Sequence, residues 1–135
     1  MFDAGMQAVV ELRAALEADL RAALLGAQML LHYQPVVQAD GRVTGAEALV
    51  RWQHPVRGRV APGEFIGLAE ATGLILPLGQ WVLATACAQI AAWGGQPQTA
   101  HLTLAVNVSA HQFVEPDFVP RVLQALDLAG ADPRR

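Results

Sequence analysis

Lysine is absent from this 135-residue chain, cysteine and tyrosine occur once each, and only 16% of the residues are charged. The nine basic residues are therefore all arginine. This suits bidentate phosphate contacts but also fits the composition of a chain rich in alanine, glycine and leucine. The net charge of −3 predicts no overall attraction to a nucleic acid polymer. The lone Cys87 excludes an internal disulfide and favours a reducing, cytoplasmic location.

The sequence also has no apolar run that we predict to span a membrane, and its start lacks the features of a signal peptide. We therefore expect no membrane contact in this segment, and any membrane anchor of the parent protein would lie outside it. The 53% of hydrophobic residues is enough to build the core of one domain and argues against disorder.

The hydrophobic pattern alternates between helical and strand spacing. Strands are predicted at 30–37 and 43–52, joined by an Asp40-Gly41 turn that makes them antiparallel. The second strand is apolar on both faces, which predicts burial on both sides. The remaining predicted elements are a helix over 7–25, a loop over 54–63, a helix from Pro62 to Gly73, a helix over 78–93, a strand over 102–109 and a helix over 115–130.

The last of these helices should direct four apolar side chains inward: Val119, Val122, Leu123 and Leu126. Alternating helices and strands after the hairpin predict an α/β protein built from βα units.

Polar side chains stand inside the otherwise apolar predicted strands: Gln34, Glu47, Arg51 and Asn107. Strand alternation places Glu47 and Arg51 on one face of their strand, and Asn107 shares its face with Thr103 and Ala105. A functional interpretation is a hard-cation site of Glu and Asn oxygens beside a phosphate-binding arginine. The alternative is structural: Glu47 and Arg51 pair with neighbouring strands, and Asn107 satisfies backbone groups. Spacing alone leaves both open.

Other kinds of site lack their sequence signals. The histidines show no zinc-ligand spacing and there is no CxxC motif. Ser109 follows the third predicted strand and is interpreted as a helix N-cap. No GxSxG elbow surrounds it, which argues against a nucleophile. No glycine-rich nucleotide-binding loop is present.

Four motifs, in this order, resemble the EAL domain family: HYQPVV at 32–37, EALVRW at 47–52, His54-Pro55 followed by GRVAPGEFIGLAEATGLI at 58–75, and VNVSAHQF at 106–113. The resemblance covers residues 11–135. Residues 1–10 are expected to be a linker from an upstream GGDEF domain, whose end the opening Phe2-Asp3-Ala4-Gly5-Met6 resembles.

The resemblance implies a TIM-like barrel with an antiparallel first strand. It also implies hydrolysis of cyclic di-GMP to pGpG with two Mg²⁺ or Mn²⁺ ions. Residue by residue, Glu47 and Asn107 match metal ligands. Gln34 and Arg51 match positions that contact the dinucleotide, Arg51 at a phosphate, and Leu49 matches an apolar position near the ligand.

The sequence departs from the family pattern in two ways. Gly67 stands where the family usually has proline, and the chain ends at 132–135, before the family's later glutamates, Asp-Asp pair and lysine. We therefore expect the N-terminal half of an EAL domain, a partial barrel truncated before it closes, since a complete barrel takes about 250 residues. Such a fragment is expected to be inactive alone. It is also expected either to be poorly stable or to form a homo-oligomer through exposed half-barrel edges or through the parent domain's dimer.

Three functions of the parent domain follow from the resemblance. It is an active cyclic di-GMP phosphodiesterase, a non-catalytic cyclic di-GMP receptor, or a signalling scaffold that binds neither metal nor dinucleotide. The apparent metal ligands Glu47 and Asn107 are kept, which favours the enzyme.

Overall fold

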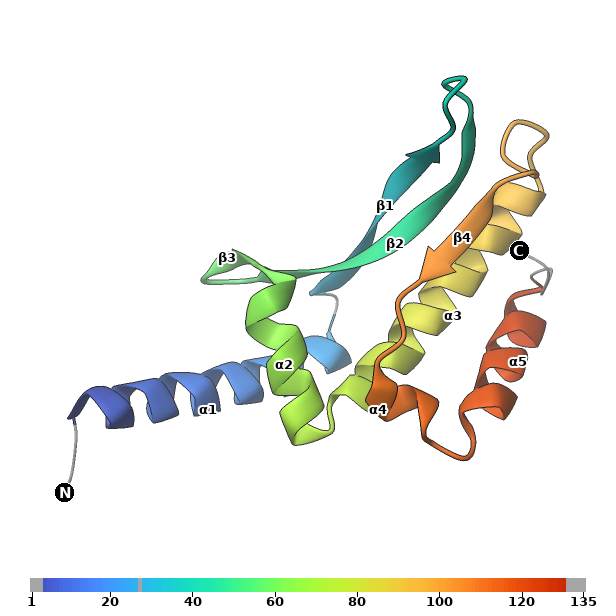
Figure 1. The fold of residues 1–135 in the computed structure, drawn as a ribbon. Coiled ribbons are helices and arrows are strands. Elements are labelled where there is room, and N and C mark those ends of the chain that lie inside the picture. Colours follow the sequence, from blue (N-terminus) through green and yellow to red (C-terminus); the bar gives the residue numbers. More distant parts are fainter. Residues whose placement is uncertain (1–3, 27, 131–135) are drawn as a thin grey trace. The chain divides into compact units, whose positions relative to one another are not determined.

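The computed structural model describes residues 4–26 and 28–130 and contains both helices and strands (Figure 1). It divides into two compact units, described separately below. The first contains α1, α2 and β3, and the second contains β4, α4 and α5, while β1, β2 and α3 contribute to both. The elements are α1 (Ala4–Leu25), β1 (Met29–Val37), β2 (Val43–His54), β3 (Gly58–Val60), α2 (Pro62–Thr72), α3 (Ile75–Gly94), β4 (Thr103–Val106), α4 (Ala110–Phe113) and α5 (Phe118–Ala129).

The first unit is organised around the fully buried indole of Trp52 on β2. Its ring packs edge-on against Phe65 of α2, with centroids 5.7 Å apart. Its Nε1–H donates to the Gln28 side-chain oxygen at 3.1 Å, so the polar atom of this buried ring is satisfied. Leu20 of α1 and Leu78 of α3 are also fully buried.

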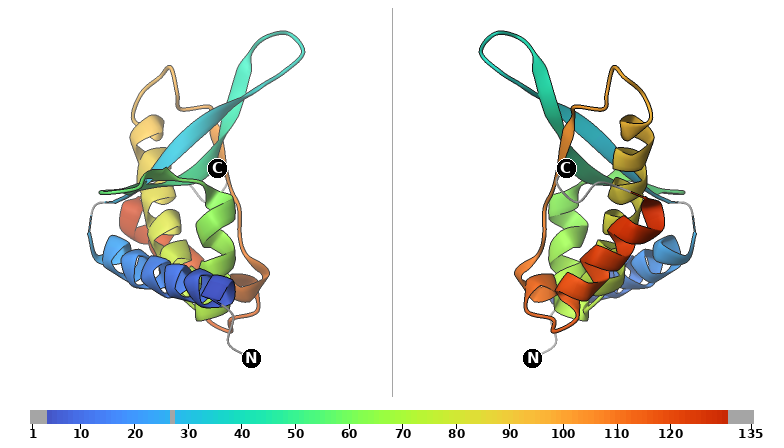
Figure 2. Two further views of the ribbon diagram at one scale, coloured as in Figure 1. Left: turned by 90° about the vertical axis from the view of Figure 1, so that its left-hand side faces the viewer. Right: turned by 90° about the vertical axis from the view of Figure 1, so that its right-hand side faces the viewer.

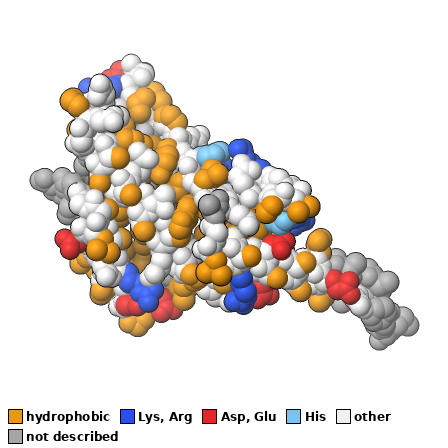
Figure 3. All heavy atoms as spheres, turned by 180° about the vertical axis from the view of Figure 1, so that it is seen from behind, with side chains coloured by type: hydrophobic (Ala, Val, Ile, Leu, Met, Phe, Trp, Pro, Cys, Tyr) orange, Lys and Arg blue, Asp and Glu red, His pale blue; other side chains and the backbone are white. Residues whose placement is uncertain are grey.

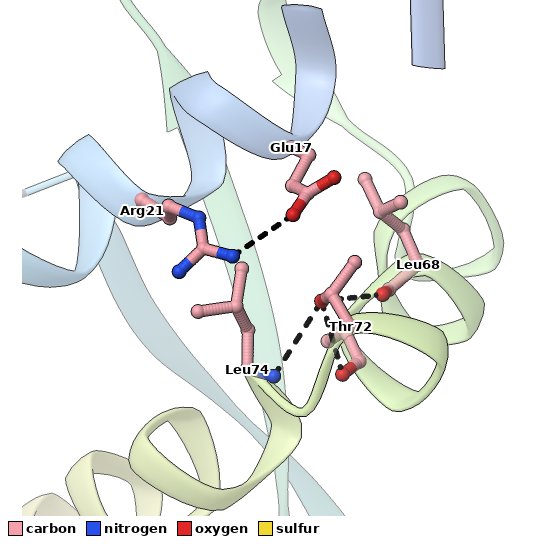
Figure 4. Close-up of polar contacts among 6 residues, drawn as sticks. Glu17, Arg21, Leu68, Thr72 and Leu74 are labelled. Atoms are coloured by element: carbon pink, nitrogen blue, oxygen red, sulfur yellow. Dashed lines mark hydrogen bonds and ion pairs between the residues drawn. The ribbon is translucent and has the colours of Figure 1, made fainter. Parts of the chain in front are cut away.

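Polar contacts lie along α1 and at the end of α2 in this unit (Figure 4). Arg21 bridges Glu17 one turn away along α1 at 2.9 Å. Pro62 opens α2, and Gly73 ends it in a left-handed conformation at φ 81°. The Thr72 hydroxyl donates to a carbonyl of the last turn, Leu68, at 2.8 Å. The predicted helix from Pro62 to Gly73 is confirmed.

The segment predicted as a loop over 54–63 contains a short strand, β3, so this prediction is wrong in part. β3 pairs antiparallel with the end of β2, with Trp52 opposite Val60. His54 stabilises the turn between them, because its Nδ1 accepts the backbone N–H groups of Val56 and Arg57, both at 3.0 Å. The other ring nitrogen, Nε2, therefore carries the proton and donates to the Asp19 carboxylate of α1 at 2.7 Å.

The second unit packs one face of its sheet against α3. The buried residues of this core come from β2, β4 and α3, with Leu31, Tyr33, Trp93 and Val106 packed around them: Ala46, Ala48, Ala86, Ile90 and Leu104. Tyr33 and Trp93 meet edge-on with ring centroids 5.5 Å apart. Burial raises the pKa of the Tyr33 hydroxyl and of the Cys87 thiol above their ordinary values, as expected for groups in a core rather than a reactive site.

Strand β2 is the central strand, paired with β1, β3 and β4. The predicted β1–β2 hairpin is confirmed. Its turn contains Gly41 at φ 83°, and the Asp40 carboxylate accepts the backbone N–H of Arg42 at 2.9 Å. Residues 34–43 around this turn are exposed, and both views of Figure 2 show the hairpin tip extending away from α3.

The region after α3 differs from its prediction in three ways. β4 ends at Val106 rather than 109, a short helix α4 intervenes, and α5 begins at Phe118 rather than 115. The inward direction predicted for Val119 and Leu123 is wrong, because they are 61% and 56% exposed and no residue of α5 is fully buried. In the described part of this unit, the side chains of Val119 and Leu123 on α5 are left uncovered.

Helix α3 is, by length and composition alone, apolar enough to cross a membrane. The prediction that no segment is long and apolar enough to span a membrane therefore does not hold for α3 by these two criteria. The core helix of a soluble protein passes the same test, and Ala86 and Ile90 of this helix pack against the sheet.

Two helical glycines differ sharply in their surroundings and provide a matched pair of variants. A Cβ at Gly79 of α3 would overlap the Gln112 carboxamide, whereas one at Gly67 of α2 has no neighbour within 4 Å. We expect Gly79→Ala to lower the free energy of unfolding by about 1–3 kcal/mol through overpacking. Gly67→Ala should raise it by about 0.5–1 kcal/mol, because the unfolded chain loses conformational freedom.

Urea denaturation followed by far-ultraviolet circular dichroism measures both changes. Equal unfolding midpoints for the two alanine variants would contradict the close packing at Gly79.

Candidate functional site

The candidate site lies on the sheet face opposite α3. On β2, Ala46 and Ala48 are buried in the core with α3, whereas Glu47 on the alternate face is half-buried. The prediction that β2 is buried on both faces is therefore wrong for the described residues. The physical reason is that α3 covers only one face, so the polar side chains of β2 remain accessible.

Glu47 and Asn107 meet on this open face although they are 60 residues apart in sequence. The Asn107 Nδ2 donates to Glu47 Oε1 at 3.1 Å. β2 and β4 pair in parallel with Glu47 opposite Ala105, and Asn107 directly follows the end of β4. Parallel pairing and register thus bring the two predicted metal ligands into contact.

Gly45 allows the two strands to approach closely just before the site. It lies opposite Thr103, and a Cβ at Gly45 would stand 2.6 Å from Thr103 Oγ1 and 2.7 Å from its carbonyl oxygen. Any larger residue would push β4 away from β2. The glycine two residues before Glu47 therefore contributes to the Glu47–Asn107 distance.

The other predicted site residues are placed along the same strands. Gln34 is exposed on β1. Strand alternation directs its side chain to the other face of the sheet from Tyr33, which packs against the core. Leu49 is half-buried and shares the face of Glu47. Arg51 is half-buried at the next position on that face of β2, and it has an interaction partner.

A hard divalent cation fits the donor set of this pair. Glu47 offers carboxylate oxygens, and Asn107 offers its amide oxygen once the amide turns so that Oδ1 rather than Nδ2 faces the carboxylate. Among residues 4–26 and 28–130, no cluster of three or more His, Cys, Asp and Glu side chains occurs. Since Mg²⁺ demands octahedral coordination, the described residues supply only part of a coordination shell.

The sequence interpretation missed the side chain of Gln112, which contacts the segment that follows Asn107. It is the buried polar residue of the described chain and accepts the backbone N–H of Ser109 at 3.1 Å. The predicted position of Ser109 before a helix is confirmed, since α4 begins at Ala110. The S-x-x-Q spacing of Ser109 and Gln112 is the signal of a capping box that would have identified this contact.

Comparison with known proteins gives the family. Residues 17–135 match the EAL domain, and the chain belongs to the EAL domain family. It is 46% identical over 128 residues to MucR of Pseudomonas aeruginosa, named a bifunctional diguanylate cyclase/cyclic di-GMP phosphodiesterase, covering 93% of this chain and 18% of MucR. It is 42% identical over 111 residues to the cyclic di-GMP phosphodiesterase PdeR of Escherichia coli, covering 82% of this chain and 16% of PdeR.

The solved structure of the MucR phosphodiesterase in complex with cyclic di-GMP is similar to this chain, with a TM-score of 0.84 and 45% identity. The match covers 88% of this chain and 48% of that one. The predicted α/β fold, part of a TIM-like barrel of the EAL type, is confirmed. The chain spans less than a fifth of these two curated relatives and about half of the solved structure.

Proposed function

We propose that this chain supplies one half of the active site of a cyclic di-GMP phosphodiesterase. The observation that carries the proposal is the contact of Glu47 with Asn107 at 3.1 Å on the open sheet face. In a barrel with its helices outside, this face lines the interior and the strands' carboxyl ends carry the chemistry. Asn107 directly follows such a strand end, that of β4.

In this proposal Glu47 and Asn107 hold a Mg²⁺ or Mn²⁺ ion of a two-metal site whose other ligands lie outside the described residues. When bound, such cations stabilise the attacking and leaving oxygens of an in-line displacement at phosphorus. Arg51 contacts a phosphate of the dinucleotide through its guanidinium, Gln34 hydrogen-bonds the substrate, and Leu49 packs against it. The product is the linear dinucleotide pGpG.

The alternatives are a receptor that binds cyclic di-GMP without cleaving it and a scaffold that binds neither metal nor dinucleotide. Keeping both Glu47 and Asn107 in contact favours the enzyme, because a receptor has no need for a paired carboxylate and amide at a strand end. The structural interpretation of Glu47, an ionisable side chain paired with a neighbouring strand, explains the contact but not its position on the accessible face.

A chimera tests the proposal. Replacing the matching segment of MucR's phosphodiesterase domain by residues 17–135 of this chain should give a protein that hydrolyses cyclic di-GMP to pGpG with Mg²⁺ or Mn²⁺. The 135-residue chain alone should show no hydrolysis, because the donor set of its described residues is incomplete. The measurement is product formation by liquid chromatography, with chelator as control.

The other outcomes decide between the functions. A folded chimera that binds cyclic di-GMP but leaves it intact would support the receptor, and one that does not bind it would support the scaffold. Hydrolysis by the purified 135-residue chain would contradict the proposed division of the site.

We also propose that the isolated chain forms a homo-oligomer. Figure 3 shows many apolar side chains at the surface on the side away from the viewer in Figure 1. The exposed large apolar residues include Val36 of the hairpin and Leu128 of α5, which is 80% exposed. Exposed large apolar side chains are candidate positions for such an interface. A cytoplasmic location and an upstream GGDEF domain stay predictions, and Phe2 and Asp3 of the GGDEF-like opening lie outside the described residues.

A further inference from the structure

Gln112 forms a closed set of contacts with the segment that follows Asn107. Its side-chain Oε1 accepts the backbone N–H of Ser109 at 3.1 Å, and its own backbone N–H donates to the Ser109 carbonyl at 3.1 Å. Both backbone groups of Ser109 are thereby bound by one residue. This fixes the chain two residues after Asn107, where β4 has already ended.

The carboxamide of Gln112 is held in turn by α3. Gln112 as a whole is 7% exposed, and its carboxamide lies directly over Gly79, where any Cβ would overlap it. The glycine therefore forms a notch in α3 that only a residue without a side chain can provide. Helix α3 therefore contacts Gln112, which in turn binds Ser109, although α3 itself covers the opposite face of the sheet from Glu47.

We infer that Gln112, seated over Gly79, is a positioning residue that holds Asn107 in contact with Glu47. The expected effect of Gln112 on metal binding rests on the proposed function. The positioning of Asn107 by Gln112 does not. Asn107 lies outside the ladder of β4, so strand pairing alone does not fix its backbone. The hydrogen bond to Ser109 supplies the missing constraint, and its loss should loosen Asn107 without unfolding the sheet.

Gln112→Met separates positioning from packing. Methionine still fills the Gly79 notch but cannot accept the Ser109 N–H. In the full 135-residue chain, we expect the Ser109 amide to exchange with solvent about 10-fold faster. The Asn107 side-chain amide resonances should move toward those of Glu47→Ala, in which the contact is absent. Gln124→Met, an exposed change on α5, is the matched control and should alter neither.

The chimera with MucR provides the metal readout. Gln112→Met should raise the Mn²⁺ concentration for half-maximal hydrolysis about 10-fold and leave KM for cyclic di-GMP close to its original value. In an Asn107→Ala background the same change should have no further effect, because Gln112 acts through Asn107.

Asn107 resonances and a metal requirement unchanged by Gln112→Met would overturn the inference while leaving the proposed function intact. An unsubstituted chimera without hydrolysis would instead defeat the proposed function. The amide exchange and the Asn107 resonances would then decide the inference alone.

Discussion

Glu47→Gln in the chimera with MucR is expected to lower kcat for cyclic di-GMP at least about 100-fold. Glutamine has the same shape and its oxygen can still accept the Asn107 hydrogen bond, so the packing of β2 against β4 is retained. What changes is the negative charge of this side chain, which strengthens its binding of a divalent cation. Initial rates of pGpG formation at saturating substrate measure the effect.

The matched control is Glu115→Gln, which neutralises an exposed carboxylate in the loop before α5. It should leave kcat unchanged, and both variants should keep the unfolding midpoint of the parent chimera. A Glu47→Gln chimera with full kcat would show that Glu47 is a structural partner of Asn107 and remove it from the proposed metal site.

Trp52→Ala is expected to cost about 3–5 kcal/mol in the free energy of unfolding of the 135-residue chain. The indole is fully buried, packs against Phe65 and donates to Gln28. Its removal leaves a cavity and an acceptor without its donor. Chemical denaturation followed by far-ultraviolet circular dichroism measures the loss without relying on tryptophan fluorescence.

Trp52→Phe keeps a ring against Phe65 but removes the Nε1–H, so its midpoint should lie between those of the original chain and the alanine variant. This variant remains informative if Trp52→Ala does not fold. Leu25→Ala changes a side chain that is 92% exposed and should stay within about 0.5 kcal/mol of the original. Equal midpoints for Trp52→Phe and the original chain would contradict the importance of the indole hydrogen bond.

Sequence patterns predicted the long elements and missed the short elements β3 and α4. The hairpin of β1 and β2 has a strong turn signal in Asp40-Gly41, and α2 has Pro62 and Gly73 at its ends. The strand β3 has three residues and no alternating apolar pattern, so only its pairing with β2 reveals it. Similarly, which side chains of α5 are buried depends on the elements that pack against the helix. The apolar spacing within α5 does not show which elements these are.

The candidate site was likewise predicted only in part, because some of its features are local to one strand and others depend on tertiary structure. Alternation along β2 correctly placed Glu47 on one face with Leu49 and Arg51. The contact with Asn107 depends on the parallel register of β2 and β4 and on the close approach that Gly45 allows. The register between strands that are distant in sequence is set by the tertiary structure. Motif resemblance therefore suggested Glu47 and Asn107 as a pair, and the structure shows their contact.

The alternation of the buried Ala46 and Ala48 with the half-buried Glu47 on β2 separates two kinds of mutational tolerance along a single strand. Substitutions at Ala46, Ala48 and Trp52, on the core side, should act on the amount of folded protein in a cell. Substitutions at Glu47 and Arg51, on the accessible side, should act on the output of each folded molecule. A mutational scan that scores abundance and signalling separately would then show the two scores rising and falling out of phase, with a period of two residues.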